Sequence, residues 1–254
     1  MHKKIIIIGA VLTMALASLP SNRAEAAVNC DFKDNLKELS SAQAALQSND
    51  SQENILKELS VRKKIISRAI NCSINETLSL QSNLKLTETN SPDMLNIKNT
   101  IISKLDEIIG YYQTQNGAVG DLGIGGSKIF SANLKSWRGS NYVPVSELEK
   151  NFIVFVKNQD VLQTTQNRFN QIKLTLKTLG LADNQKISDV VSQAEKNIRM
   201  ANEDNNQAED IFRKLVWPNN VSDIMLSSLQ YLKDAYQNFF DIGKEAQNIT
   251  SGSK

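Results

Sequence analysis

Histidine occurs only once in this chain of 254 residues, as His2. Residues 1–26 are typical of a secretory signal peptide, so we expect the exported chain to contain no histidine. That absence excludes a Ser-His-Asp or Cys-His nucleophile system and a histidine-ligated metal site. Prolines number only 4 and aromatic residues make up only 6%, while Asn, Gln, Ser, Lys, Leu and Ile are frequent. This composition favours long solvated helices over a compact α/β core.

The N-terminal leader has the three parts of a signal peptide. Lys3 and Lys4 give a basic start, residues 5–19 form an almost unbroken apolar run, and residues 24–26 (Ala-Glu-Ala) match a small-x-small cleavage site. The apolar run is shorter than the roughly 20 residues that a transmembrane helix needs. We therefore predict an exported protein in the periplasm, at the cell surface or outside the cell. An uncleaved N-terminal anchor is the alternative.

An excess of one charge is also missing. Lys and Arg number 29 and Asp and Glu number 27, and removal of residues 1–26 takes away three basic residues and one acidic residue. The exported chain then carries 26 of each sign. A neutral chain has no electrostatic footprint for nucleic acid or anionic lipid. We expect no nucleic-acid partner, and membrane contact only through the leader or through residues 117–130.

Only two cysteines are present, Cys30 and Cys72, and in an oxidising compartment a disulfide between them is expected. Residues 31–48 and about 52–89 are predicted helices joined by a turn. Cys30 lies 20 residues before Asp50 and Cys72 lies 22 after it, so equal rise per residue brings the two level in an antiparallel hairpin. Two free thiols awaiting a metal or a redox partner are the alternative. We expect neither a metal nor a cofactor, because there is no Cys-x-x-Cys pair and no histidine to complete a zinc site.

Helical periodicity continues almost to the end of the chain. Further helices are predicted from Pro92 to near Gly117, from Ser146 to about Gly180, over about 183–215 and over about 221–248, with residues 250–254 as a frayed tail. Two apolar stripes are clear: Ile101, Leu105, Ile108 and Tyr112 follow helical spacing, and Phe155, Leu162, Phe169 and Leu176 recur every seven residues. We predict an all-α fold, an elongated up-and-down bundle of about six long helices, forming a single domain over residues 27–249.

Residues 117–145 lack a clear helical pattern. Six of the 11 glycines lie between residues 110 and 126, which predicts one long Gly-rich connection, an irregular loop over residues 117–145. The glycine spacing does not match a phosphate-binding loop. We interpret the loop as a flexible cap on the bundle or as a partner-binding tip. As a tip, its contact residues would be Leu122, Ile124, Phe130, Trp137 and Tyr142.

These features predict an exported, non-enzymatic helical-bundle protein that acts by protein–protein contact. Structural, adhesive and sensing roles fit equally, and the partner would be another protein or a second copy of the chain. The alternative is a membrane-active or pore-forming secreted protein that uses residues 117–130, because an apolar Gly-rich segment between two long helices resembles the layout of α-helical pore-forming toxins.

Overall fold

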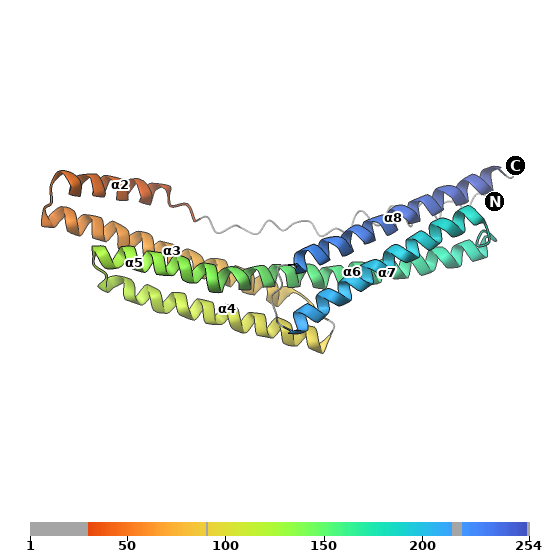
Figure 1. Ribbon diagram of the computed structural model, residues 1–254, viewed down its shortest axis with the longest axis horizontal. Helices are drawn as coiled ribbons and strands as arrows, with labels where there is room; N and C mark the ends of the chain where they lie inside the picture. Colours follow the sequence, from red (N-terminus) through yellow and green to blue (C-terminus); the bar gives the residue numbers. More distant parts are fainter. Residues whose placement is uncertain (1–29, 90, 215–219, 253–254) are drawn as a thin grey trace. The chain divides into compact units, whose positions relative to one another are not determined.

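The computed structural model describes residues 30–89, 91–214 and 220–252, and these residues are all-α, with no strand among them (Figure 1). Backbone contacts divide them into two compact units, which we name the N-terminal unit (residues 30–153) and the C-terminal unit (residues 154–252). The predicted signal peptide lies outside the described residues. None of the described helices combines the length and the apolar character that crossing a membrane requires.

The N-terminal unit is an up-and-down arrangement around one long helix. Its elements are α2 (Lys33–Ser48), α3 (Gln52–Leu86), α4 (Pro92–Ala118), the 3-10 turn η1 (Val119–Asp121) and α5 (Ile124–Trp137), followed by residues 138–153. The helix α3 packs against α2, α4 and α5 (Figure 1). It begins at an N-cap, where Ser51 Oγ accepts a hydrogen bond from the backbone N–H of Asn54 at 3.3 Å. Pro92 stands at the first position of α4, where its missing N–H costs no helical hydrogen bond.

The predicted stripe on α4 forms much of the core of this unit. None of its four side chains is more than 4% exposed, and Tyr112 is fully buried. The α3 residues buried beside α4 and α2 include Val61, Ile66, Ile70 and Leu84. The helix α2 buries much less: only Asn35 and Ala42 are buried, and Leu36 is 53% exposed. Leu39 and Leu46 are half-buried, so the apolar contact of this helix is limited.

The prediction of an irregular loop over residues 117–145 is wrong. The helix α4 runs to Ala118, η1 and α5 follow, and the π-helix η2 (Arg138–Tyr142) leads directly into α6 (Val143–Thr178). Glycine costs about 1 kcal/mol in a helix relative to alanine. The helix α5 nevertheless forms, with Ser127 buried and with Ile124 and Phe130 half-buried. Only residues 122–123 remain extended, because Gly123 is the N-cap of α5. Lys63 from α3 donates to the carbonyl oxygen of Gly120 at 2.6 Å and holds the turn.

The C-terminal unit consists of α6 beyond residue 153, α7 (Gln185–Lys214) and α8 (Val221–Gly252). The predicted heptad lies in its core: Phe155, Phe169 and Leu176 are buried, and Leu162 is half-buried. Two apolar clusters join the three helices, Phe169 with Ala194, Ile198, Ala235 and Phe239, and Leu176 with Leu181, Ile187, Ile242 and Ala246. The heptad pattern therefore predicted the buried face of α6.

A Schellman-type end separates α6 from α7. Gly180 has φ +69°, a left-handed conformation, and the N–H of Leu181 donates to the carbonyl oxygen of Leu176 at 2.9 Å. At the same end of the unit, α8 continues through Gly252. The predicted fraying therefore does not begin at residue 250, and residues 253–254 lie outside the described chain.

The boundary between the two units falls inside α6. It does not coincide with a turn or a linker, so the grouping leaves the prediction of a single domain over residues 27–249 undecided.

Candidate functional site

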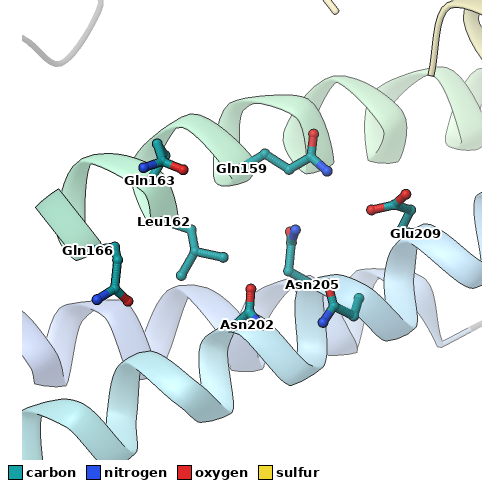
Figure 2. A pocket seen from close by; sticks show the side chains of 8 residues that line it. Gln159, Leu162, Gln163, Gln166, Asn202, Asn205 and Glu209 are labelled. Carbon is teal, nitrogen blue, oxygen red and sulfur yellow. The ribbon is translucent and has the colours of Figure 1, made fainter. Parts of the chain in front are cut away.

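The C-terminal unit carries a groove of about 330 Å³ between α6 and α7 (Figure 2). We name it the amide groove because six of its eight lining side chains end in a carboxamide, which offers both a hydrogen-bond donor and an acceptor. The lining residues are Gln159, Leu162, Gln163 and Gln166 on α6, and Asn202, Asn205, Asn206 and Glu209 on α7. No Lys or Arg lines the groove, and the Glu209 carboxylate accepts from Arg213 at 2.6 Å. The groove thus presents neutral polar groups.

A polar layer in the core holds the floor of this groove. Asn158 Nδ2 donates to Ser228 Oγ at 2.8 Å and to Asn205 Oδ1 at 3.5 Å. Ser228 Oγ in turn donates to the carbonyl oxygen of Ala201 at 3.0 Å. Asn158, Asn205 and Ser228 are all buried, so these contacts link α6, α7 and α8 away from solvent.

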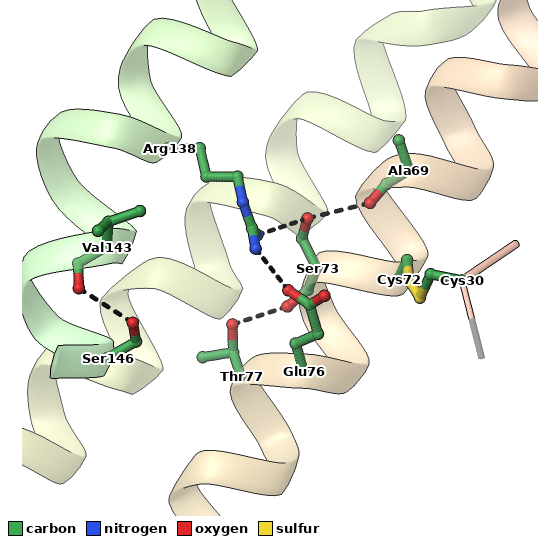
Figure 3. A network of polar contacts seen from close by, with 9 residues as sticks. All are labelled: Cys30, Ala69, Cys72, Ser73, Glu76, Thr77, Arg138, Val143 and Ser146. Carbon is green, nitrogen blue, oxygen red and sulfur yellow. Dashed lines mark hydrogen bonds and ion pairs between the residues drawn. A yellow bond between two sulfur atoms is a disulfide. The ribbon is translucent and has the colours of Figure 1, made fainter. Parts of the chain in front are cut away.

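The N-terminal unit contains a second polar group, which we name the Arg138 cluster: Ser73, Glu76, Arg138 and Tyr142. Figure 3 shows the first three of these residues. Arg138 donates to Glu76 Oε2 at 2.7 Å and to Ser73 Oγ at 3.1 Å. Its guanidinium carbon lies 4.1 Å from the centre of the Tyr142 ring, a cation–π contact. Arg138 and Tyr142 bound the π-helix η2, a rare widened turn that frequently occurs at functional sites. Pro144 follows this turn and has no N–H to donate.

The electrostatics of the Arg138 cluster fix its protonation. Burial disfavours the charge of Arg138, but the hydrogen bond to Glu76 and the negative charge of Glu76 outweigh burial and raise its pKa. Burial also raises the pKa of Tyr142 to about 12, and the nearby Glu76 charge acts in the same direction. The phenol therefore keeps its proton and the guanidinium keeps its charge at neutral pH. These groups are better suited to holding neighbouring helices together than to proton transfer, because proton transfer needs a pKa near the working pH.

Aromatic rings cover one side of the cluster. The Trp137 ring stacks on Tyr111 with 3.5 Å between ring centres and 11° between planes, and it meets Tyr112 edge-on at 5.4 Å. Burial raises the pKa of Tyr111, and the neighbouring Tyr112 adds to this effect. These ring contacts pack the residue that precedes η2 against α4.

The cysteines lie beside the same cluster. Cys30 and Cys72 are paired at disulfide distance, with 6.0 Å between their Cα atoms, which confirms the geometry predicted from the hairpin (Figure 3). The pairing is consistent with an oxidising compartment. Glu76 follows Cys72 by one helical turn, and its carboxylate lies within 4.8 Å of the two sulfur atoms. Paired sulfurs are not thiolates, so these three residues do not form a metal-binding set in this state.

The exposed side of α5 has a character of its own. We name the α5 outer face the residues Gly125, Lys128, Ile129, Ala132, Lys135 and Ser136, all of them exposed. Ile129 is 66% exposed. No acidic residue occurs between Asp121 and Glu147, and neither Lys128 nor Lys135 has an ion-pair partner among the described residues. This face is therefore both cationic and apolar.

The five predicted contact residues do not form one exposed tip. Leu122, Ile124, Phe130 and Trp137 are half-buried, and Tyr142 is buried. Trp137 and Tyr142 belong to the surroundings of Arg138, whereas the other three lie further back along η1 and α5. Their role in partner contact stays a prediction.

Sequence reasoning missed Arg138, Glu76 and the α5 outer face. One signal was available: the segment from residue 122 to residue 146 holds three cations and no acid, so any counter-charge for them must come from elsewhere in the chain. The identity of Glu76 as that counter-charge depends on α5 packing beside α3, which periodicity does not reveal.

Comparison with protein-family models, with curated proteins and with solved structures finds no match to this chain.

Proposed function

We propose that this chain is an exported, non-enzymatic helical-bundle protein that acts by protein–protein contact at the cell envelope or outside the cell. The observation that carries the proposal is the α5 outer face, where exposed Ile129 accompanies two lysines without ion-pair partners among the described residues. An apolar centre with unpaired cations suits a partner surface that is apolar at its centre and acidic at its rim.

Two further observations support this proposal. The ionisable groups of the Arg138 cluster satisfy one another, which favours a role in holding α5 on α3 rather than in catalysis. The pairing of Cys30 with Cys72 suits an exported chain, because disulfides persist in oxidising compartments. The cysteine pairing and the predicted signal peptide thus both favour a location outside the cytoplasm.

Site-specific photo-crosslinking in intact cells tests the proposal. A crosslinker at position 129 should give a product of defined mass, because its side chain faces the partner. The same crosslinker at position 174 is the matched control, because Leu174 is 67% exposed and Ile129 is 66% exposed. Charge reversal by Lys128→Glu and Lys135→Glu should remove the product. Equal products at both positions, or none at either, would contradict the proposal, and fractionation of the same cells tests export.

A membrane-active protein that uses residues 117–130 is the second candidate. The lack of acid from residue 122 to residue 146 favours it, because a cationic and apolar helix face also suits the surface of an anionic bilayer. Leakage of vesicles with anionic lipid, lost in Ile129→Asp and kept in Leu174→Asp, would support this candidate over a protein partner. Intact vesicles under all conditions would dismiss it.

A further inference from the structure

The amide groove has an incompletely satisfied floor. Asn205 lines the groove and is 4% exposed, and its Oδ1 accepts only the long 3.5 Å bond from Asn158. Asn205 Nδ2 donates to no residue in the described part of the chain. Behind it, Asn158 Oδ1 is buried without a partner among the described residues. Asn205 therefore keeps a free donor on a side chain that is otherwise buried and that lines the groove, where a bound molecule can accept from it.

The walls define the chemistry of that molecule. Lysine and arginine are absent from the lining, so an anion would find no counter-charge, and Glu209 is already engaged by Arg213. Leu162 is the one apolar side chain among the eight, so a ligand with large apolar groups would gain little from burial. The six carboxamides each offer a donor and an acceptor, which matches a ligand whose own groups are both, as hydroxyl groups are.

The dimensions agree with a small ligand. The α6 side of the groove runs from Gln159 to Gln166, about 10 Å along the helix axis. A volume of about 330 Å³ lies at the small end of ligand sites. An extended peptide of similar length would present side chains as well as main-chain amides, and such binding normally needs side-chain pockets that this lining does not supply.

We propose that the amide groove is a binding site for a neutral saccharide or similar polyol, recognised by Gln159, Gln163, Asn202 and Asn205. Asn205 supplies a free donor at the floor, and the residues on α6 and α7 pair with hydroxyl groups from the two sides. The site belongs to the C-terminal unit and is separate from the α5 outer face.

Nuclear magnetic resonance of the isotope-labelled full chain tests the site. The probes are glucose, N-acetylglucosamine and their neutral disaccharides, added singly, and a neutral tripeptide with blocked ends serves as the rival ligand. With at least one saccharide, the side-chain amide signals of Asn202 and Asn205 should shift, while those of Gln230 and Gln237 on α8 should not.

The variant Gln163→Ala/Asn202→Ala removes two exposed groove side chains without touching the buried layer. It should weaken saccharide binding at least about tenfold, as expected for two lost hydrogen bonds. Gln237→Ala is the matched control, because Gln237 donates to Asp241 four residues later just as Gln163 donates to Asn167. The control should bind like the unaltered chain. No shift with any saccharide, a shift with the tripeptide alone, or equal weakening in the control would each overturn the assignment.

Discussion

The two units of this protein are stabilised in different ways. The C-terminal unit relies on apolar side chains at regular spacing, with Phe169 and Phe239 stacked in its core at 5.8 Å between ring centres. The N-terminal unit adds single contacts between residues far apart in the sequence, such as Arg138 with Glu76, Lys63 with Gly120, and the Cys30–Cys72 pair. The stability of the C-terminal unit therefore comes mainly from apolar burial, whereas that of the N-terminal unit depends in addition on a few specific links.

The largest expected effect comes from the core of the C-terminal unit. Phe169→Ala should lower the free energy of unfolding by about 3–5 kcal/mol, because Phe169 is 1% exposed and its removal leaves a cavity. Chemical denaturation followed by circular dichroism measures this loss. Leu174→Ala on the same helix is the control and should change stability by less than about 0.5 kcal/mol, because Leu174 is 67% exposed. Similar losses in the two variants would mean that the heptad face is not the main apolar contact.

Removal of the disulfide should have the next largest effect, and in the other unit. The bond closes a loop with a sequence separation of 42, so Cys30→Ser should cost about 3–4 kcal/mol. Hydrogen exchange should show α2 losing protection first, because α2 buries only Asn35 and Ala42, while α7 and α8 stay protected. Detection of two free thiols in the unreduced protein would refute the pairing.

The Arg138–Glu76 contact should give a smaller but measurable coupling. Both side chains are 35% exposed, so solvent weakens the ion pair, and a double-mutant cycle with Arg138→Leu and Glu76→Gln should give a coupling of about 1 kcal/mol. Arg199 and Glu203 in the C-terminal unit are the comparison pair, 3.6 Å apart and 64% and 53% exposed. Their coupling should lie below about 0.5 kcal/mol. Equal couplings would show that the Arg138 cluster is an ordinary surface pair.

Two glycines give the smallest effects, with opposite signs. Gly180→Ala should destabilise the C-terminal unit by about 1 kcal/mol, because φ is +69° there and a Cβ strains that conformation. Gly110→Ala in α4 should stabilise the N-terminal unit by up to about 1 kcal/mol, because it raises helix propensity and a Cβ there meets nothing within 4 Å. Thermal unfolding of both variants distinguishes the signs, and destabilisation at Gly110 would show that α4 needs a glycine at that position.

Sequence reasoning succeeded where one element carries its own periodic signal. The stripe on α4 and the heptad on α6 follow from spacing alone, and the pairing of Cys30 with Cys72 follows from equal rise along two helices around one turn. The buried positions of α2 did not follow, because its apolar residues are few and Leu36 faces solvent.

The α5 region escaped prediction for a different reason. Its glycines weaken local helix propensity, so α5 needs tertiary contacts, among them packing on α3 and the stacking of Trp137 on Tyr111 of α4. The Arg138 cluster joins residues about 60 positions apart, and the amide groove needs both α6 and α7 in register. Sites of this kind depend on how the helices pack against one another, and the periodicity of a single sequence does not reveal that packing.

The position of the disulfide has a consequence for how the protein responds to proteolysis. Asn49 and Asp50 are exposed in the turn between α2 and α3, and exposed turns of this kind are preferred sites of proteolytic cleavage. Cys30 precedes this turn and Cys72 follows it, so a single cut there leaves the two pieces covalently joined. The Glu38–Lys64 and Asn35–Arg68 contacts then act within one molecule rather than between two fragments. With the disulfide in place, a single cut at this turn therefore leaves α2 attached to the folded protein.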